Sequence, residues 1–126
     1  MGAIMTQITL TNPINTKTHT MEALVDTGAV RMALPEDIVR FLDLPTLDTV
    51  VATLATNETR TLEIAGPFIL EILGRKIATD CFVLPATSQA LIGQLVLEGL
   101  DLIADCPKHE VYPRHPESPY PVLNLK

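Results

Sequence analysis

The segment "EALVDTGAV", Glu22–Val30, decides how the rest of the chain is interpreted. Met21, Ala23 and Val25 fall on one face at period two, which predicts a half-buried strand. This strand ends abruptly on Asp26, followed by a threonine and a glycine, so the chain carries a carboxylate from its interior to an edge or cleft. The glycine would allow a second backbone or a substrate to approach closely. An ordinary turn accounts for the same residues, because Asp, Thr and Gly are common at strand ends.

Length and composition predict one compact domain. A chain of 126 residues buries roughly two-thirds of its unfolded surface, and its 47% hydrophobic and 19% charged residues are ordinary for a globular protein. The net charge of −6 and the lack of a dense Lys/Arg cluster argue against a nucleic-acid partner. Neither a long apolar run nor a signal-like N-terminus is present, so we expect no membrane partner and a cytoplasmic location.

The cysteines and histidines do not predict a metal site. Cys81 and Cys106 lack metal-ligand spacing, which favours reduced thiols, although a single disulfide is an alternative. His19, His109 and His115 lie in a strand-like segment and a Pro-rich tail, where exposed or locally hydrogen-bonded imidazoles are expected. We therefore expect neither a metal nor another cofactor.

Short strands separated by turn residues dominate the chain. Segments 5–12 and 18–25 flank a turn at 12–15 and predict a first hairpin. Segments 47–55 and 59–66 flank a polar tip and predict a second hairpin. The segment "FILEILGRKIATDCFVLP", residues 68–85, predicts two further strands joined across Gly74 and Arg75.

Helix signals are few. Residues 34–44 have Pro35 at a natural first helical position, acids in the first turn and apolar residues at helical spacing. A second short helix is predicted over 93–100. The fold class is therefore all-β, a small barrel or sandwich with one or two short helices. We expect one domain over 1–126, with a core over about 5–106 and a Pro-rich tail at 107–126 that drapes over a surface or is solvated.

The chain resembles a known family at several points. The segment "ALVDTGA", residues 23–29, resembles the catalytic loop of the retroviral-type aspartic proteases, or retropepsins, and their single-domain cellular relatives. Residues 68–85 are similar to the paired strands that follow their flap, and "ALIGQLVLEGLDL", residues 90–102, is similar to their hydrophobic-hydrophobic-Gly element and short helix. The resemblance covers roughly residues 5–106. It implies a retropepsin-like acid-protease barrel, one lobe per chain, completed as a homodimer.

The resemblance also implies an activity, aspartic endopeptidase hydrolysis of a peptide or protein substrate. This chemistry needs one ionised carboxylate to activate water and one protonated carboxyl group to donate to the substrate carbonyl. Asp26 is the only aspartate followed by Thr/Ser-Gly. The second carboxyl group must then come from Asp26 of a second copy, which an isologous dimer places near its two-fold axis.

The family pattern assigns further roles by position. Thr27 would hydrogen-bond across the dimer, Gly28 would let the substrate backbone approach, Ala29 would complete the tight loop, and Gly93 would pack behind it. The tip of the second hairpin corresponds to the flap, the mobile cover that closes over bound peptide. Its substrate-binding residues would be Ala55, Thr56, Asn57 and Glu58.

The sequence departs from the family at several places. The predicted flap has no glycine between Met32 and Ile64, whereas viral flaps are glycine-rich at the tip. Gln94 stands where many relatives have Arg, and Val30 and Arg31 stand where viral enzymes carry acids. These departures support an alternative, a catalytically inactive peptide-binding or scaffolding module on the same dimeric fold. Segments 6–10 and 121–126 have patterning suited to the interleaved terminal strands of retropepsin dimers.

Overall fold

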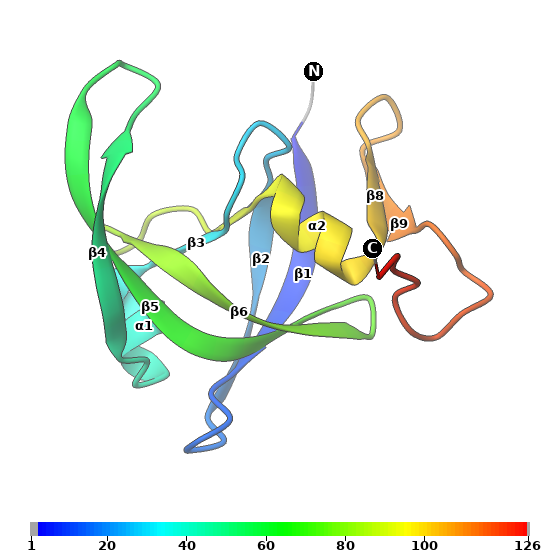
Figure 1. Cartoon of the computed structure of the whole chain (residues 1–126), viewed down its shortest axis with the longest axis horizontal. Coiled ribbons are helices and arrows are strands. Elements are labelled where there is room, and N and C mark those ends of the chain that lie inside the picture. The colour runs from blue at the N-terminus through cyan, green and yellow to red at the C-terminus, as the bar shows by residue number, and fades with distance from the viewer. Residues whose placement is uncertain (1–2, 126) are drawn as a thin grey trace.

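The computed structural model describes residues 3–125 and consists mainly of β-strands in a mixed sheet, with two short helices (Figure 1). This agrees with the expected all-β class. The seven strands of the main sheet are ordered β1-β2-β7-β3-β6-β5-β4. In chain order the elements are β1 Ile4–Thr11, β2 Thr18–Val25, β3 Ala33–Pro35, α1 Glu36–Phe41, β4 Thr46–Thr53, β5 Thr59–Ile72, β6 Arg75–Leu84, β7 Leu91–Ile92, α2 Gln94–Leu100, β8 Leu102–Asp105 and β9 Glu110–Pro113.

The main sheet closes on itself through β1. This strand pairs along its whole length with β2 in an antiparallel hairpin, as predicted, and its last residues also pair with β5. The ring of strands therefore runs from β1 through β2, β7, β3, β6 and β5 and back to β1. Inside it lie fully buried residues such as Leu34, Phe68 and Ile92. Burial of this apolar surface at roughly 25 cal/mol per Å² is the main stabilising contribution to such a fold.

The predicted strands at 59–66 and 68–72 are one continuous strand, β5, which corrects the sequence-based division. The first predicted segment ended at Gly66 and the next began at Phe68. Instead the register against β6 shifts between Ala65 and Phe68, so a bulge absorbs the two residues. The single strand pairs with β4 over its first half and with β6 from Ile64 to Ile72.

The predicted second hairpin is confirmed and forms an arm that stands away from the ring of strands at the left of Figure 1. This β4–β5 arm comprises residues 46–65. Most of its side chains are exposed, and only Ile64 and Ala65, at its base, are buried. The arm is therefore held by its backbone ladder and its base, and its free end projects over the neighbouring loops.

Both predicted helices are present. Pro35 is the N-cap of α1 and the last residue of β3, with extended backbone angles, so the expectation that it occupies the first helical position was wrong by one residue. Helix α2 buries Val96, Leu97 and Leu100 against the ring of strands. Its N-terminus follows β7 directly, which places it next to the Asp26 loop (residues 26–31).

The Pro-rich tail is more structured than predicted. Residues 110–113 form β9, which pairs with β8, so the paired structure extends beyond the expected core limit at 106. Beyond β9, His115, Ser118 and Val122 hydrogen-bond to buried residues near the end of α2, so this stretch lies against the rest of the fold although most of its residues are exposed. Pro121–Leu125 forms no strand within the described chain. Interleaving of this segment with a second copy stays a prediction.

Candidate active site around Asp26

Asp26 is held at the end of a buried strand. Val25 closes β2 inside the core, and β2 pairs in parallel with β7. The N–H of Asp26 donates to the carbonyl oxygen of Ile92 at 2.9 Å, and the N–H of Leu24 donates to Ala90 at 2.8 Å. These bonds fix the backbone up to Asp26, whose side chain is half-buried. The core strand therefore delivers its carboxylate to a partly open position.

The loop after Asp26 is tight and bonded to the carboxylate itself. The N–H of Gly28 donates to Asp26 Oδ1 at 3.0 Å, and the N–H of Ala29 donates to the Asp26 carbonyl oxygen at 3.0 Å. A Cβ at position 28 would lie 3.3 Å from Oδ1, tighter than ordinary packing. Thr27 and Gly28 are exposed. The loop thus orients one carboxylate oxygen and leaves its own outer surface uncovered.

Helix α2 supports this loop from behind. The first N–H groups of a helix lack partners within it, and here the loop carbonyls accept from them. Gln94 N–H donates to Ala29 at 2.8 Å, and Leu95 N–H donates to Val30 at 3.0 Å. Gly93, the N-cap, approaches so closely that a Cβ there would lie 2.6 Å from the Val30 carbonyl oxygen. Glycine at position 93 is therefore required by backbone contact.

We expect Gly93→Ala to lower the free energy of unfolding by about 2 kcal/mol, because overpacking against rigid backbone costs about 1–3 kcal/mol. Urea unfolding followed by circular dichroism measures the change. Gly99→Ala is the matched control within α2, since its Cβ would meet the end of the flexible Ile77 side chain. The control should lose less than half as much. Equal losses in the two variants would contradict the close-contact explanation.

A cavity of about 630 Å³ lies between the Asp26 loop and the β4–β5 arm. Its volume falls in the range of about 300–1,000 Å³ that is usual for ligand sites. The walls are mainly apolar, and Asp26 and Arg31 are the charged residues among them. The lining residues are Asp26, Gly28, Ala29, Val30, Arg31, Ala33, Ala52, Thr53, Leu54, Ala55, Leu62, Phe82, Leu84 and Leu91.

The structure brings part of the predicted site together. Asp26, Gly28 and Ala29 line the cavity from one side, and Ala55 of the predicted flap lines it from the other. Thr27 lies on the exposed side of the loop, and Gly93 lies behind it. Thr56, Asn57 and Glu58 form the tip of the arm and do not line the cavity.

The sequence reasoning did not identify the other walls of the cavity. On the arm these are Ala52, Leu54 and Leu62, whose partial burial alternates with exposed neighbours. This alternation can be recognised in the sequence, but the sequence does not show which face of the arm lies toward the cavity. Phe82 and Leu91 reach the cavity because β6 and β7 both pair with β3.

The tip of the arm turns without glycine. Asn57 adopts a left-handed conformation with φ of 67°, which Asn tolerates better than most residues. Two hydrogen bonds close the turn, from Leu54 N–H to the Glu58 carbonyl at 2.8 Å and from Asn57 N–H to the Leu54 carbonyl at 2.9 Å. Asn57 therefore takes the conformational role that glycine usually fills in tight turns.

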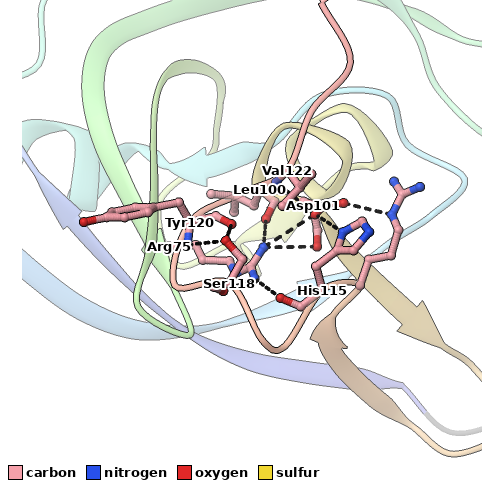
Figure 2. Close-up of polar contacts among 8 residues, drawn as sticks. Arg75, Leu100, Asp101, His115, Ser118, Tyr120 and Val122 are labelled. Carbon is pink, nitrogen blue, oxygen red and sulfur yellow. Dashed lines mark hydrogen bonds and ion pairs between the residues drawn. The ribbon is translucent and has the colours of Figure 1, made fainter.

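A buried polar network lies at the other end of α2 (Figure 2). Asp101 is fully buried, and its Oδ2 accepts from Val122 N–H at 3.0 Å and lies 2.9 Å from His115 Nδ1. Arg114 Nε lies 2.8 Å from Oδ1, but this contact is not aligned as a hydrogen bond. Arg75, only 3% exposed, donates to the carbonyl oxygens of Leu100, Asp101, His115 and Ser118.

This network fixes the tail and favours an ionised Asp101. The hydrogen bond from His115 contributes most to lowering the pKa of Asp101 below its usual 3.8. Burial acts in the opposite direction, and the Val122 N–H and the charge of Arg114 also lower the pKa. The C-terminal end of α2 is thus fixed by Arg75 and Asp101, while its N-terminal end holds the Asp26 loop.

Metal ligands, the two cysteines and the length of the helices were also considered for the described residues. Within residues 3–125, no group of three His, Cys, Asp or Glu residues is arranged to hold a metal ion. Cys81 and Cys106 are free thiols, and burial is the main cause that raises the pKa of Cys81 to about 12. None of the helices in this part of the chain is long and apolar enough to cross a membrane.

No protein-family model matches the chain, and neither does any curated protein.

Proposed function

We propose that the protein is a retropepsin-like aspartic endopeptidase that acts as a homodimer, with Asp26 of each copy supplying one catalytic carboxyl group. The proposal combines the resemblance of residues 23–29 and 90–102 to retropepsins with the geometry around Asp26. One observation carries it. An oriented, partly exposed carboxylate lines an apolar cavity that the β4–β5 arm covers from the opposite side.

This arrangement suits a peptide substrate. The cavity offers apolar walls for side chains, and the arm provides strand backbone above an extended chain. Asp26 would act on the scissile bond from the side of the cavity opposite the arm, with its Oδ1 oriented by the N–H of Gly28. A turn that served only the fold would need the Asp26–Gly28 hydrogen bond but would not need the cavity. The cavity therefore favours a working carboxylate over the simple turn.

The reaction needs two carboxyl groups in different protonation states. One ionised carboxylate takes a proton from water, whose oxygen adds to the peptide carbonyl carbon. The protonated carboxyl group donates to the carbonyl oxygen, and the tetrahedral intermediate then breaks at the C–N bond as the leaving nitrogen is protonated. Like charges held close together share one proton, so the pair titrates as a unit.

The second carboxyl group is assigned to another copy of the chain. Among residues 3–125, Asp26 is the only carboxylate that lines the cavity. The outer surface of the loop is also uncovered, with Val30 66% exposed and the adjacent Leu95 57% exposed. Exposed apolar residues beside an incomplete site are what a protein interface would cover. A two-fold dimer through this surface would supply the missing group.

A peptide-binding or scaffolding module without catalysis is the second candidate. Residues of the Asp26 loop and of the tip of the β4–β5 arm favour this candidate. Val30 and Arg31 replace acids of the viral enzymes, and Asn57 replaces glycine at the tip of the arm. The same cavity would then bind peptide side chains, and Asp26 would serve as a hydrogen-bond acceptor.

Binding of a transition-state mimic distinguishes the two candidates. A statine-type peptide carries a hydroxyl group that imitates the tetrahedral intermediate, and a matched peptide lacks this hydroxyl. Enzymes bind such mimics at least about 100-fold more tightly than ground-state ligands. We expect this difference in dissociation constants, measured by isothermal titration calorimetry on the full chain. Equal affinities would favour the binding module, and failure of both peptides to bind would overturn both candidates.

A further inference from the structure

The cavity beside Asp26 carries one cation within the described residues, Arg31. Arg31 is the last residue of the Asp26 loop, just before the chain enters β3. Its side chain is 44% exposed, so part of the guanidinium faces solvent or cavity space. The other lining residues, apart from Asp26, are neutral. A ligand in this cavity therefore meets one negative and one positive side chain on otherwise uncharged walls.

The contacts of Arg31 position its guanidinium without fully neutralising it. Its Nη1 lies 3.8 Å from Asp80 Oδ1, which is too long for a hydrogen bond, and both side chains are partly exposed. Exposed ion pairs of this kind contribute little to the stability of the fold. The guanidinium carbon also lies 5.9 Å from the centre of the Phe82 ring, in a cation–π contact. Phe82 lines the same cavity, so the arginine side chain lies near its wall, and together with Asp80 it also lines a smaller neighbouring pocket of about 120 Å³.

A guanidinium in this position is suited to a carboxylate ligand. Its planar set of donors matches a carboxylate with two parallel hydrogen bonds, which lysine or a neutral side chain cannot reproduce. Apolar walls weaken screening and so strengthen such a pair. The small side chains of Ala33, Ala52 and Ala55 leave room for a bulky apolar group nearby.

We propose that Arg31 determines substrate specificity by selecting peptides that carry Asp or Glu next to a large apolar residue close to the cleaved bond. This inference rests on the proposed peptide-binding function. The protein has a net charge of −6, which on its own would repel acidic peptides. Arg31 is thus the local feature that reverses the general electrostatic preference inside the cavity.

The test compares peptides that differ only by Glu or Gln at each position around an apolar cleavage site. Cleavage by the full chain is measured as kcat/KM, and binding of the same peptides to Asp26→Asn is measured by fluorescence anisotropy. We expect Glu to be preferred about ten-fold or more at one position, as a charged hydrogen bond implies. In Arg31→Gln this preference should disappear, and in Arg31→Glu a Lys peptide should replace the Glu peptide as the preferred ligand.

Lys76→Gln is the control for net charge, because Lys76 lies outside the Asp26 cavity and its loss changes the charge by the same amount. It should keep the Glu preference of the wild type. A preference that persists in Arg31→Gln, or no Glu preference in a protein that binds or cleaves peptides, would overturn the role of Arg31 alone. Absence of both binding and cleavage for every peptide would instead overturn the proposed function.

Discussion

Replacing Asp26 with Asn should abolish peptide cleavage and leave the fold intact. The amide cannot take a proton from water at neutral or acidic pH, and general acid–base catalysis of this kind contributes about 100-fold to 10,000-fold. We expect kcat/KM to fall at least about 1,000-fold. The fold should persist because the side-chain oxygen of Asn can still accept the hydrogen bond from Gly28 N–H. Peptide cleavage assays and urea unfolding measure the two effects separately.

Two controls make this result specific. Asp105→Asn removes a carboxylate from β8, outside the cavity, and should cleave at the wild-type rate. Mixing wild-type protein with an excess of Asp26→Asn should also lower the wild-type activity, because mixed dimers contain one carboxyl group instead of two. Cleavage by Asp26→Asn at the wild-type rate would refute catalysis by this residue. Activity unaffected by mixing would refute a site shared between exchanging copies.

The individual strands and helices could be predicted because the sequence patterns that indicate them span only a few residues. The hairpin of β1 and β2, the arm and both helices follow from alternation, turn residues and capping, which act over a few residues. The position of Asp26 at a strand end follows from the same reasoning. Even so, the sequence-based division ended one strand at Gly66 and began another at Phe68. A bulge in a long strand has the same residues as a turn, and only the partner strand distinguishes them.

The cavity walls and the tail could not be predicted in the same way. Leu62 and Phe82 face Asp26 only because the sheet closes and the arm projects over the loop. Arg75 contacts residues of the tail that lie 40 and 43 positions later in the chain. In sequence it is an ordinary residue after a hairpin glycine, and nothing nearby indicates burial. Contacts of this length depend on the complete fold.

Replacing Arg75 with Met should destabilise the protein by about 3 to 5 kcal/mol. The loss of one partner from a buried charged network has costs of this size, because the remaining polar groups are left unpaired. Four carbonyl oxygens would lose a hydrogen bond from the guanidinium, although those of Asp101 and His115 would keep one from a backbone N–H. Asp101 would also lose a cation whose Nη1 lies 3.8 Å from its carboxylate. Met keeps a similar length but has neither the charge nor the hydrogen-bond donors. Urea unfolding measures the loss.

The same variant should release the tail. His115 and Ser118 are fixed by Arg75, so amide hydrogen exchange over 114–122 should rise in Arg75→Met before global unfolding. Arg60→Met is the matched control, since Arg60 is exposed on β5 of the same sheet and should change stability by less than about 0.5 kcal/mol. Equal stability of Arg75→Met and Arg60→Met would contradict a structural role for the network.

The pH dependence of this network tests the charge of Asp101. Its pKa is lowered in the folded protein, so its ionised form contributes stability that is fully present above 3.8, the unfolded value. This contribution is lost as the pH falls below 3.8 and through the lower folded pKa. Unfolding measured from pH 7 to pH 2 should therefore show the difference between wild type and His115→Ala shrinking below about pH 4, since the His115 hydrogen bond is the main cause of the lowered pKa of Asp101. A difference that stays constant over this range would mean that His115 stabilises the fold independently of the charge of Asp101.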